Sequence, residues 1–436
     1  MSPLTPQQVL ALAPDDASAK AAQGLVKPAK WVTLGAFEGG LWGECQGSGK
    51  TPYLTYVDLG NTAFKCSCPS RKFPCKHGLG LYLLYAQHPK GFDTPAQLPP
   101  DLQQWLQKRQ AKTETKNEKE HKPVDEAARQ KRQEARHQKV EQGIAALQVW
   151  LKDLVRGGIA QVPQQMPGLA LGMAARMVDA QAPGLAWQLR RLSDLNYFED
   201  GWQLNFLRSI SGLYMATLLH GQKSAAAAKQ AADSNLYVGY PVAKEEVLQQ
   251  PAMADNWLVL AKNTSIEDNL TAETTWLYGL QHKKFAQHLQ FLVRNQVPEV
   301  LLTTGTILQA ELVFYPGTYP LRALFKSGTQ QVNLQPQFTE HMGMDRVKQT
   351  ASGLLAHNPF LENIPFLLPG VTLQQGAAHW LLADAQKGSL PLLNPEKDRY
   401  HLLAATGGQA FDAFVLYRQG GVHVQTLFAK HKMVVL

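Results

Sequence analysis

The chain has 436 residues, of which 44% are apolar and 18% charged, and its formal net charge at pH 7 is +8. Its length exceeds what one hydrophobic core usually supports and predicts about three domains, while its composition is that of an ordinary globular protein. No apolar run approaches the roughly 18 residues that a membrane-spanning helix needs. The amino terminus lacks a basic leader and predicts a short helix beginning near Thr5, so we expect a cytoplasmic protein.

The first β-rich segment is residues 51–66, which alternate like a pair of strands. At its start, Gly49-Lys50-Thr51 is similar to the end of a phosphate-binding P-loop. That loop needs a glycine where this chain has Glu44, and a helix where it has Pro52 and further alternation. The sequence therefore predicts a glycine-rich turn between strands in place of a nucleotide site, with Cys45 as a partly buried thiol on a strand.

Three of the four cysteines lie close to one another and to a histidine, at Cys66, Cys68, Cys75 and His77. A reducing compartment disfavours a structural disulfide, and a thiol redox pair would favour the spacing C-x-x-C, which this cluster lacks. Zn²⁺ prefers four tetrahedral sulfur and nitrogen ligands, so a set of three cysteines and one histidine closes its coordination shell. Apolar residues at helical spacing follow over 79–86. The pattern predicts a ββα zinc knuckle with Cys75 and His77 at the entrance of the helix.

The pattern C-x-C, six intervening residues and C-x-H, preceded by a strand hairpin and followed by an apolar helix, resembles the SWIM zinc finger of bacterial proteins, chromatin-associated ATPases and Mutator-type transposases. The motif covers about 40 residues. The stretch MVDAQAPGLA at 177–186 also resembles bacterial SWIM proteins of similar length. The resemblance implies that Cys66, Cys68, Cys75 and His77 bind one structural zinc ion, and that the protein recognises nucleic acid or a protein partner. It does not identify that partner.

Charge is concentrated in residues 108–142, where eleven Lys or Arg against seven Asp or Glu supply +4 of the net charge of +8. The first half of this segment has almost no apolar residue and predicts a disordered linker. After Pro123 the composition favours a helix, with an apolar stripe from Val140 to Leu154 that ends before Gly157-Gly158. The turns before the stripe would project into solvent as a basic helix. Two interpretations are compatible with these basic turns: a solvated face without a partner, and a contact with nucleic acid.

Residues 143–235 carry apolar side chains every three or four positions, with a break at Pro183-Gly184, and predict a helical subdomain. Beyond them strand signals dominate, with helices expected at 284–292 and 344–357 and with the aromatic residues expected in the core. The predicted fold class is multidomain α+β. Its parts are an amino-terminal region at 1–107 with the zinc knuckle at about 53–90, the basic segment at 108–142, the helical subdomain at 143–235, and an α+β domain with an antiparallel sheet at 236–436.

Signatures of catalysis are few. The sequence has no nucleophile elbow, no zinc-protease helix and no dinucleotide-binding glycine loop. His282 and His288 stand six residues apart, which is the wrong helical spacing for a shared metal, so we expect them to be solvent-facing or core histidines. The zinc of the finger is no catalytic candidate either, because four protein ligands leave no position open for water.

Two classes of function follow. In the first, a non-enzymatic, zinc-binding recognition or adaptor protein uses its finger to bind nucleic acid, DNA or RNA, through a basic tip formed by Lys65, Arg71, Lys72 and Lys76. A protein–protein adaptor for an ATPase-type partner system, which the resemblance suggests, is the alternative within this class. In the second, the carboxy-terminal domain holds an unrecognised active site. The first class is favoured because it does not require an active site that the sequence fails to show. Within it, the basic tip favours nucleic acid over a protein partner. No membrane partner is expected.

Overall fold

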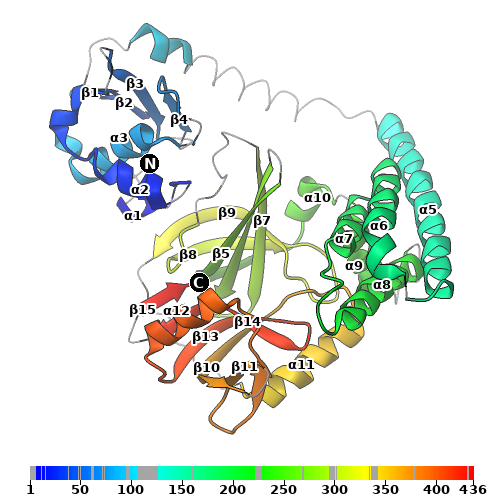
Figure 1. Ribbon diagram of the computed structural model, residues 1–436. Coiled ribbons are helices and arrows are strands. Elements are labelled where there is room, and N and C mark those ends of the chain that lie inside the picture. The colour runs from blue at the N-terminus through cyan, green and yellow to red at the C-terminus, as the bar shows by residue number, and fades with distance from the viewer. Residues whose placement is uncertain are drawn as a thin grey trace. The chain divides into compact units, whose positions relative to one another are not determined.

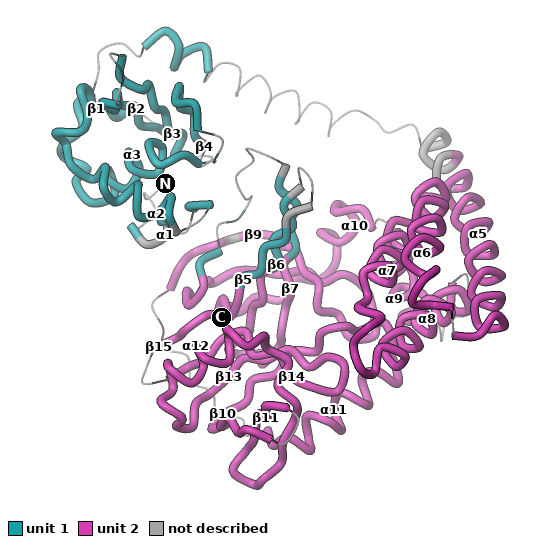
Figure 2. Tube along the Cα trace, in the orientation of Figure 1, with its two compact units in different colours: residues 1–123, 262–274, 289–303 teal, residues 124–261, 275–288, 304–436 magenta. Residues whose placement is uncertain are grey.

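The computed structural model divides into two compact units, drawn in different colours in Figure 2. Unit 1 comprises residues 1–123, 262–274 and 289–303, and unit 2 comprises residues 124–261, 275–288 and 304–436. The four-part division predicted from the sequence stays a prediction. The structure describes residues 6–10, 12–14, 16–37, 39–47, 49, 51–59, 63–70, 72, 74–94, 99–105, 126–159, 161–220, 228–240, 242–267, 270–293, 300, 302–332, 334, 342–376, 379–429 and 432–436. No helix within these residues has the length and apolar character needed to cross a membrane.

The first part of the chain forms a four-stranded antiparallel sheet in the order β1-β2-β3-β4, and α3 packs against β2 and β3 (Figure 1). Because each strand is antiparallel to the next, the start of β1, the end of β2, the start of β3 and the end of β4 lie at one end of the sheet. The strand pair predicted before the cysteines is β3 and β4. The elements are α1 (Pro6–Leu10), α2 (Asp16–Gln23), β1 (Trp31–Phe37), β2 (Gly40–Cys45), β3 (Tyr53–Asp58), β4 (Ala63–Cys66) and α3 (Lys76–Gln87).

Helix α3 is apolar around most of its circumference, and all of residues 77–84 are buried. A helix of this kind needs cover on more than one face. Strands β2 and β3 supply Leu41 and Val57 to the core around it, and α1 and α2 supply Val9 and Ala22. The predicted ββα knuckle is therefore present, but it is built into a larger core that also requires β1, β2, α1 and α2.

Unit 2 begins with a bundle of helices whose facing apolar side chains form one core. The stripe predicted between Val140 and Leu154 lies in it, with Val140 and Leu147 fully buried. The predicted helical middle region is thus confirmed, although its first helix begins well before residue 143. The helices are α5 (Glu126–Arg156), α6 (Val162–Asp179), α7 (Pro183–Ser193), α8 (Trp202–Leu219) and α9 (Ala228–Val238), and the short α10 (Lys244–Leu248) follows.

The Pro183-Gly184 pair begins α7. Pro183 is the first residue of this helix, where its missing N–H would have no intrahelical partner in any case. A Cβ atom on Gly184 would collide with the backbone of Tyr237 and Gly239 at the end of α9. Gly239 has a φ of 95°, a left-handed conformation that glycine adopts readily. Both glycines are therefore required for the close approach of the α7 start to the α9 end.

The basic part of α5 is not wholly solvated, contrary to the prediction. The guanidinium of Arg136 donates hydrogen bonds to the carbonyl oxygens of Gln181 (3.1 Å) and Gly239 (3.3 Å), and it lies 5.3 Å from the centre of the Tyr240 ring. His137 is hydrogen-bonded to the Tyr240 hydroxyl at 3.0 Å. Carbonyls near helix ends need donors, and α5 supplies one to the ends of two neighbouring helices. The predicted disordered linker falls largely on residues 106–125, which lie outside the described ones.

Two sheets form the rest of the fold, and the pairs β5-β8, β8-β9, β10-β11, β11-β12, β10-β13, β13-β14 and β14-β15 are antiparallel. The far ends of β5 and β7 and the start of β6 belong to unit 1. The strand orders of the two sheets are β7-β6-β5-β8-β9 and β12-β11-β10-β13-β14-β15. A core containing Leu258, Trp276 and Phe414 joins the two sheets, and helices α11 and α12 contribute to the core of the second sheet. This confirms the predicted α+β class. The elements are β5 (Met253–Glu267), β6 (Leu270–Gly279), β7 (Phe285–Val293), β8 (Ile307–Phe314), β9 (Ala323–Val332), α11 (Met344–His357), β10 (Ile364–Gln375), β11 (Trp380–Ala383), β12 (Ser389–Pro391), α12 (Glu396–Thr406), β13 (Phe411–Arg418), β14 (Gly421–Ala429) and β15 (Lys432–Val435).

The helix predicted at 284–292 is wrong, because this segment is strand β7 paired with β6. Burial alternates along it, with Ala286 and His288 buried between partly exposed neighbours. Its apolar residues fit both a helical and a strand period over so short a run, and pairing with β6 selects the strand. The helix predicted at 344–357 is α11.

Candidate metal centre

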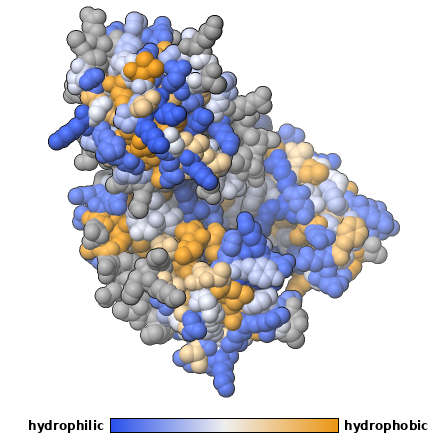
Figure 3. Space-filling view, turned by 60° about the vertical axis from the view of Figure 1, so that its left-hand side comes forward, coloured by the Kyte–Doolittle hydropathy of each residue, from blue (hydrophilic) through white to orange (hydrophobic). Residues whose placement is uncertain are grey.

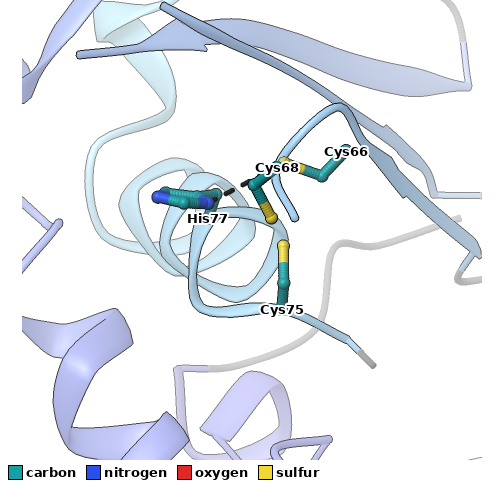
Figure 4. Close-up of side chains that lie close together, drawn as sticks. All are labelled: Cys66, Cys68, Cys75 and His77. Carbon is teal, nitrogen blue, oxygen red and sulfur yellow. Dashed lines mark hydrogen bonds between the residues drawn. The ribbon is translucent and has the colours of Figure 1, made fainter. Parts of the chain in front are cut away.

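The four predicted metal ligands come from a strand, a loop and the start of a helix. Cys66 is the last residue of β4, Cys68 lies in the loop that follows, and Cys75 immediately precedes α3, whose second residue is His77. Figure 4 shows the Cys68 and Cys75 thiols directed toward each other and the imidazole of His77 joined by a hydrogen bond to the cluster. The fold therefore brings all four side chains to one place.

The spacing of the donor atoms fits a zinc ion. One donor atom from each of the four residues lies within 4.8 Å of all the others, and Cys66 Sγ is 3.8 Å from His77 Nδ1. A tetrahedral Zn²⁺ with bonds of about 2.3 Å to sulfur and about 2.0 Å to nitrogen places sulfur and nitrogen about 3.5 Å apart, and two sulfurs about 3.8 Å apart. The observed cluster is at most about 1 Å wider than this arrangement. It fits one four-coordinate structural zinc ion.

Hydrogen bonds within the cluster distribute its protons unequally. The pKa of Cys75 is lowered to about 4, chiefly by a hydrogen bond from the Cys66 thiol. Hydrogen bonds from His77 and the Gly78 N–H lower it further, whereas burial acts in the opposite direction. The same hydrogen bond raises the pKa of Cys66. Cys75 therefore holds its thiolate readily, and the thiolate is the form of cysteine that binds metal. Zinc binding then displaces the remaining thiol protons.

Packing holds the start of α3 against the sheet. The ring of Tyr53 on β3 lies 5.0 Å from the imidazole of His77, measured between ring centres. The hydroxyl oxygen of Thr55 lies 3.3 Å from Cys66 Sγ. A Cβ atom on Gly78 would come within 2.9 Å of the Phe64 ring, so glycine permits the close approach of α3 to β4. These contacts orient two of the four ligands before any metal binds.

Cys45 is separate from the cluster. It ends β2, is fully buried in the core of unit 1, and burial raises its pKa. It does not belong to the group of residues whose donor atoms converge. The loop that contains Gly49 joins β2 to β3, which are paired from Gly40 with Asp58 to Cys45 with Tyr53. No helix follows this loop, so the P-loop is excluded, as predicted.

Exposed lysines surround the cluster. Lys65 is on β4, with its Nζ 5.5 Å from the centre of the Tyr56 ring, Lys72 is in the ligand loop, and Lys76 is the first residue of α3. Arg71 lies outside the described residues. Lys30 is a further cation that the sequence pattern did not indicate. It precedes β1 at the same end of the sheet, and its charge and that of Lys76 both act on the Cys45 thiol. The role predicted for Lys65, Arg71, Lys72 and Lys76 in nucleic-acid binding stays a prediction.

His282 and His288 have separate surroundings, and the helical spacing behind the prediction does not apply because His288 lies on strand β7. His282 Nδ1 lies 2.9 Å from a carboxylate oxygen of Asp255, whereas His288 is buried with its Nδ1 3.2 Å from the carbonyl oxygen of Ala323. Within the described part of the chain, the finger cluster is the one group of three or more Cys, His, Asp or Glu side chains with the geometry to hold a metal.

Comparison with known proteins matches two segments of the chain. Residues 53–86 match the family model of the SWIM zinc finger, and residues 135–236 match that of the SWIM-associated four-helix bundle domain. The first segment contains β3, β4, α3 and the four-residue cluster, and the second runs from α5 into α9. The family matches thus confirm the resemblance carried by C-x-C and C-x-H. No curated protein and no solved structure matches the chain.

Proposed function

Because the chain carries a zinc-binding SWIM finger followed by the associated helical bundle, we propose that it is a recognition protein whose finger contacts the phosphate backbone of DNA or RNA. The observation that carries the proposal is the gathering of lysines around the zinc cluster, at one end of the sheet of unit 1. Zinc has a structural part in this proposal, since it fixes the loop that presents these charges.

The charge balance of the finger loop supports contact with an anion. Residues 64–77 contain four cations, Lys65, Arg71, Lys72 and Lys76, and no Asp or Glu. A zinc ion with three thiolates and a neutral imidazole carries one negative charge in total, so the loaded segment keeps a net excess of three positive charges. The described lysines among them are exposed. A compact positive surface attracts phosphate groups and releases condensed counterions when it binds them.

The strand order adds to this positive end of the sheet. Lys30 stands before β1, beside the end of β2, and so joins the cations of β4 and α3. Lys30 and Lys76, which are distant in sequence, therefore lie near the same end of the sheet. One carboxylate, that of Glu44 on β2, also lies at this end of the sheet. It accepts a hydrogen bond of 2.7 Å from the Thr33 hydroxyl.

Three aromatic residues of the finger are buried and so are unavailable for base stacking. Tyr56, Phe64 and Tyr82 are all buried, so these described aromatics form the core of unit 1 and offer no stacking platform. Lysine contacts to phosphate position a nucleic acid without reading its bases. We therefore expect binding that depends strongly on salt and little on sequence.

A protein partner is the second candidate, and the bundle carries the observation that favours it. Helix α8 exposes Leu204, Leu207, Met215 and Leu218, which fall on one face of the helix. On the side of the molecule drawn in Figure 3, hydrophobic side chains form patches separated by hydrophilic ones. An exposed apolar helix face is a typical feature of protein-docking surfaces.

Fluorescence anisotropy titrations of the full-length, zinc-loaded protein with duplex DNA, single-stranded DNA and RNA, each at several salt concentrations, test the proposal. Each phosphate contact adds about −0.9 to the slope of log K against log salt for duplex DNA, so the four cations of the finger loop predict a slope of up to about −3.6. Unrelated sequences should bind with similar affinity. An absence of binding at low salt, or binding that salt does not weaken, would exclude backbone contact. Capture of a protein that Leu207→Asp abolishes would favour the adaptor function instead.

A further inference from the structure

One row of residues crosses the four-stranded sheet of unit 1 from edge to edge. Each member is paired with the next, in the order Gly35 on β1, Trp42 on β2, Tyr56 on β3 and Lys65 on β4. Side chains alternate between the two faces of a strand, and the neighbouring Leu41 and Val57 belong to the core around α3. The row therefore lies on the face of the sheet opposite α3.

The row places two aromatic rings beside an ammonium group. A Cβ atom on Gly35 would collide with the indole of Trp42, so glycine lets this ring lie against β1. Lys65 is exposed, and its Nζ lies 5.5 Å from the centre of the Tyr56 ring. Sheets that present aromatic side chains in this way bind single strands, because unpaired bases stack on the rings while a cation contacts the backbone. Lys65 also precedes Cys66, so the row is continuous with the lysines around the zinc cluster.

Residues 99–105, which we call the strap, cover Tyr56. They include a short helix at 100–105, whose Trp105 ring is stacked on the Tyr56 ring with 6.2 Å between centres and 29° between planes. Leu102 is fully buried and Trp105 is half-buried, whereas the other residues of this helix are exposed. A helix of this length is not stable without packing, so the position of the strap depends on these two side chains. With the strap in place, Tyr56 offers no stacking surface.

The strap resembles the ligand that the row would bind. The indole of Trp105 takes the place over Tyr56 that a nucleobase would occupy. Asp101 adds a negative charge, as a phosphate would: burial, and then the charges of Asp101 and Glu44, raise the pKa of Tyr56. The Tyr56 hydroxyl and the Trp42 Nε1 are buried without a hydrogen-bond partner among the described residues. Unpaired polar atoms are costly to bury, which lowers the free energy needed to displace the strap.

We propose that Trp42, Tyr56 and Lys65 form a stacking surface for single-stranded nucleic acid, and that the strap closes this surface until a strand displaces Trp105 from Tyr56. The proposal rests on the nucleic-acid function proposed for the finger and adds base contacts to it. In the open state, unpaired bases stack on the two rings and the adjacent phosphate contacts Lys65. Duplex DNA does not compete with the strap, because its bases are already stacked on one another and unstacking them is costly.

Anisotropy titrations with an oligo(dT) strand and with a duplex of the same length test the proposal on the full-length, zinc-loaded protein. Trp105→Ala removes the stack on Tyr56 and should tighten binding of oligo(dT) at least about fivefold, because apparent affinity rises with the fraction of open protein. Duplex affinity should stay within about twofold. Trp105→Phe keeps a stacking ring and should behave like the wild type. Gln104→Ala, at an exposed position of the same helix, is the matched control and should change neither affinity.

A second variant and hydrogen exchange complete the test. Tyr56→Leu in the Trp105→Ala background removes the ring on which a base stacks and should abolish the gain for oligo(dT). In the wild type, the backbone N–H groups of Leu102 and Gln103 both donate to the carbonyl oxygen of Pro99. Oligo(dT) should therefore accelerate amide exchange in residues 99–105, whereas duplex DNA should not.

The proposal is overturned if Trp105→Ala with full zinc content binds oligo(dT) no more tightly than the wild type, or if bound oligo(dT) leaves exchange in the strap unchanged. Salt-dependent duplex binding in that case would still support contact between the finger and the phosphate backbone, so the two proposals fail separately. An absence of binding to both nucleic acids, in the wild type and in Trp105→Ala, would overturn both.

Discussion

Cys66 Sγ and His77 Nδ1 lie 3.8 Å apart, although the two residues are eleven positions apart along the chain and stand on a strand and a helix. The strand ends at Cys66, and Cys75 immediately precedes the helix in which His77 is second, so the contact is closed by the packing of α3 on β3 and β4. Cys68 and Cys75 complete the cluster from the loop between them. Metal binding is therefore coupled to the position of the helix start relative to the sheet.

Zinc content should distinguish the cluster from the remaining cysteine. We expect one Zn²⁺ per chain in protein without affinity-tag histidines, measured by elemental analysis. Cys75→Ala removes a thiolate ligand and should reduce zinc to well below one equivalent, because a three-ligand site binds far more weakly. Cys45→Ala removes a buried thiol outside the cluster and should keep the full equivalent. Full zinc content in Cys75→Ala would contradict the assignment.

Removal of zinc should unfold the finger selectively. Structural zinc contributes on the order of 10 kcal/mol of binding free energy, which a chelator takes away from unit 1. The cores of the bundle and of the two sheets contain no cluster residue, so their melting transition should persist. Scanning calorimetry with and without chelator measures this. Loss of all cooperative melting on chelation would show that the two units do not fold separately.

The tip of the finger should contribute to the salt dependence of nucleic-acid binding. The double variant Arg71→Ala, Lys72→Ala should reduce the magnitude of the salt slope by about 1.8 on duplex DNA, or by about 1.4 on single strands, because two counterion-releasing contacts are lost. Zinc content serves as the folding control. Lys20→Ala, Lys90→Ala removes the same charge outside the ligand loop and should leave the slope nearly unchanged. An unaltered slope in the Arg71, Lys72 variant would argue for a protein partner.

Close backbone contact should make Gly184 sensitive to substitution. Gly184→Ala places a methyl group against the backbone of Tyr237 and Gly239, so it should lower the free energy of unfolding of unit 2 by about 2 kcal/mol or more. Gly172→Ala is the matched control, since nothing lies within 4 Å of its Cβ position on α6. That change should stabilise the bundle by up to about 1 kcal/mol through helix propensity. Denaturant titration followed by circular dichroism compares the two.

Acid should destabilise the bundle through His220. Burial, and then the nearby charge of His137, lower the pKa of His220 below its usual 6.5. A lowered pKa means that the unfolded chain takes up the proton more readily, so this contribution is complete above about pH 6.5 and is lost as pH falls below it. His220→Gln should flatten the loss of stability from pH 7 to pH 5, by at most about 1.4 kcal/mol per pH unit.

Periodicity over short runs predicted some elements and misassigned one. The helices α3, α5 and α11 have apolar residues at helical spacing over enough turns to exclude a strand. The nine residues of β7 fit both periods, and only their pairing with β6 selects the strand. The residues of the turn between β6 and β7 do not indicate a hairpin either. Lys283 has a positive φ there, at a position where glycine or asparagine is the usual signal.

The zinc site could be predicted from the amino-acid sequence alone, because all four ligands lie within one short segment whose residue types and spacing match the coordination chemistry of Zn²⁺. The sequence also determined the apolar stripes of the bundle and the strand-rich character of the last 200 residues or so. The burial of α3 from several sides and the position of Lys30 near Lys76 could not be predicted from the sequence and emerge from the tertiary fold. Each of these depends on strand order and on contacts between segments far apart along the chain, and such contacts leave no local period or spacing from which to predict them.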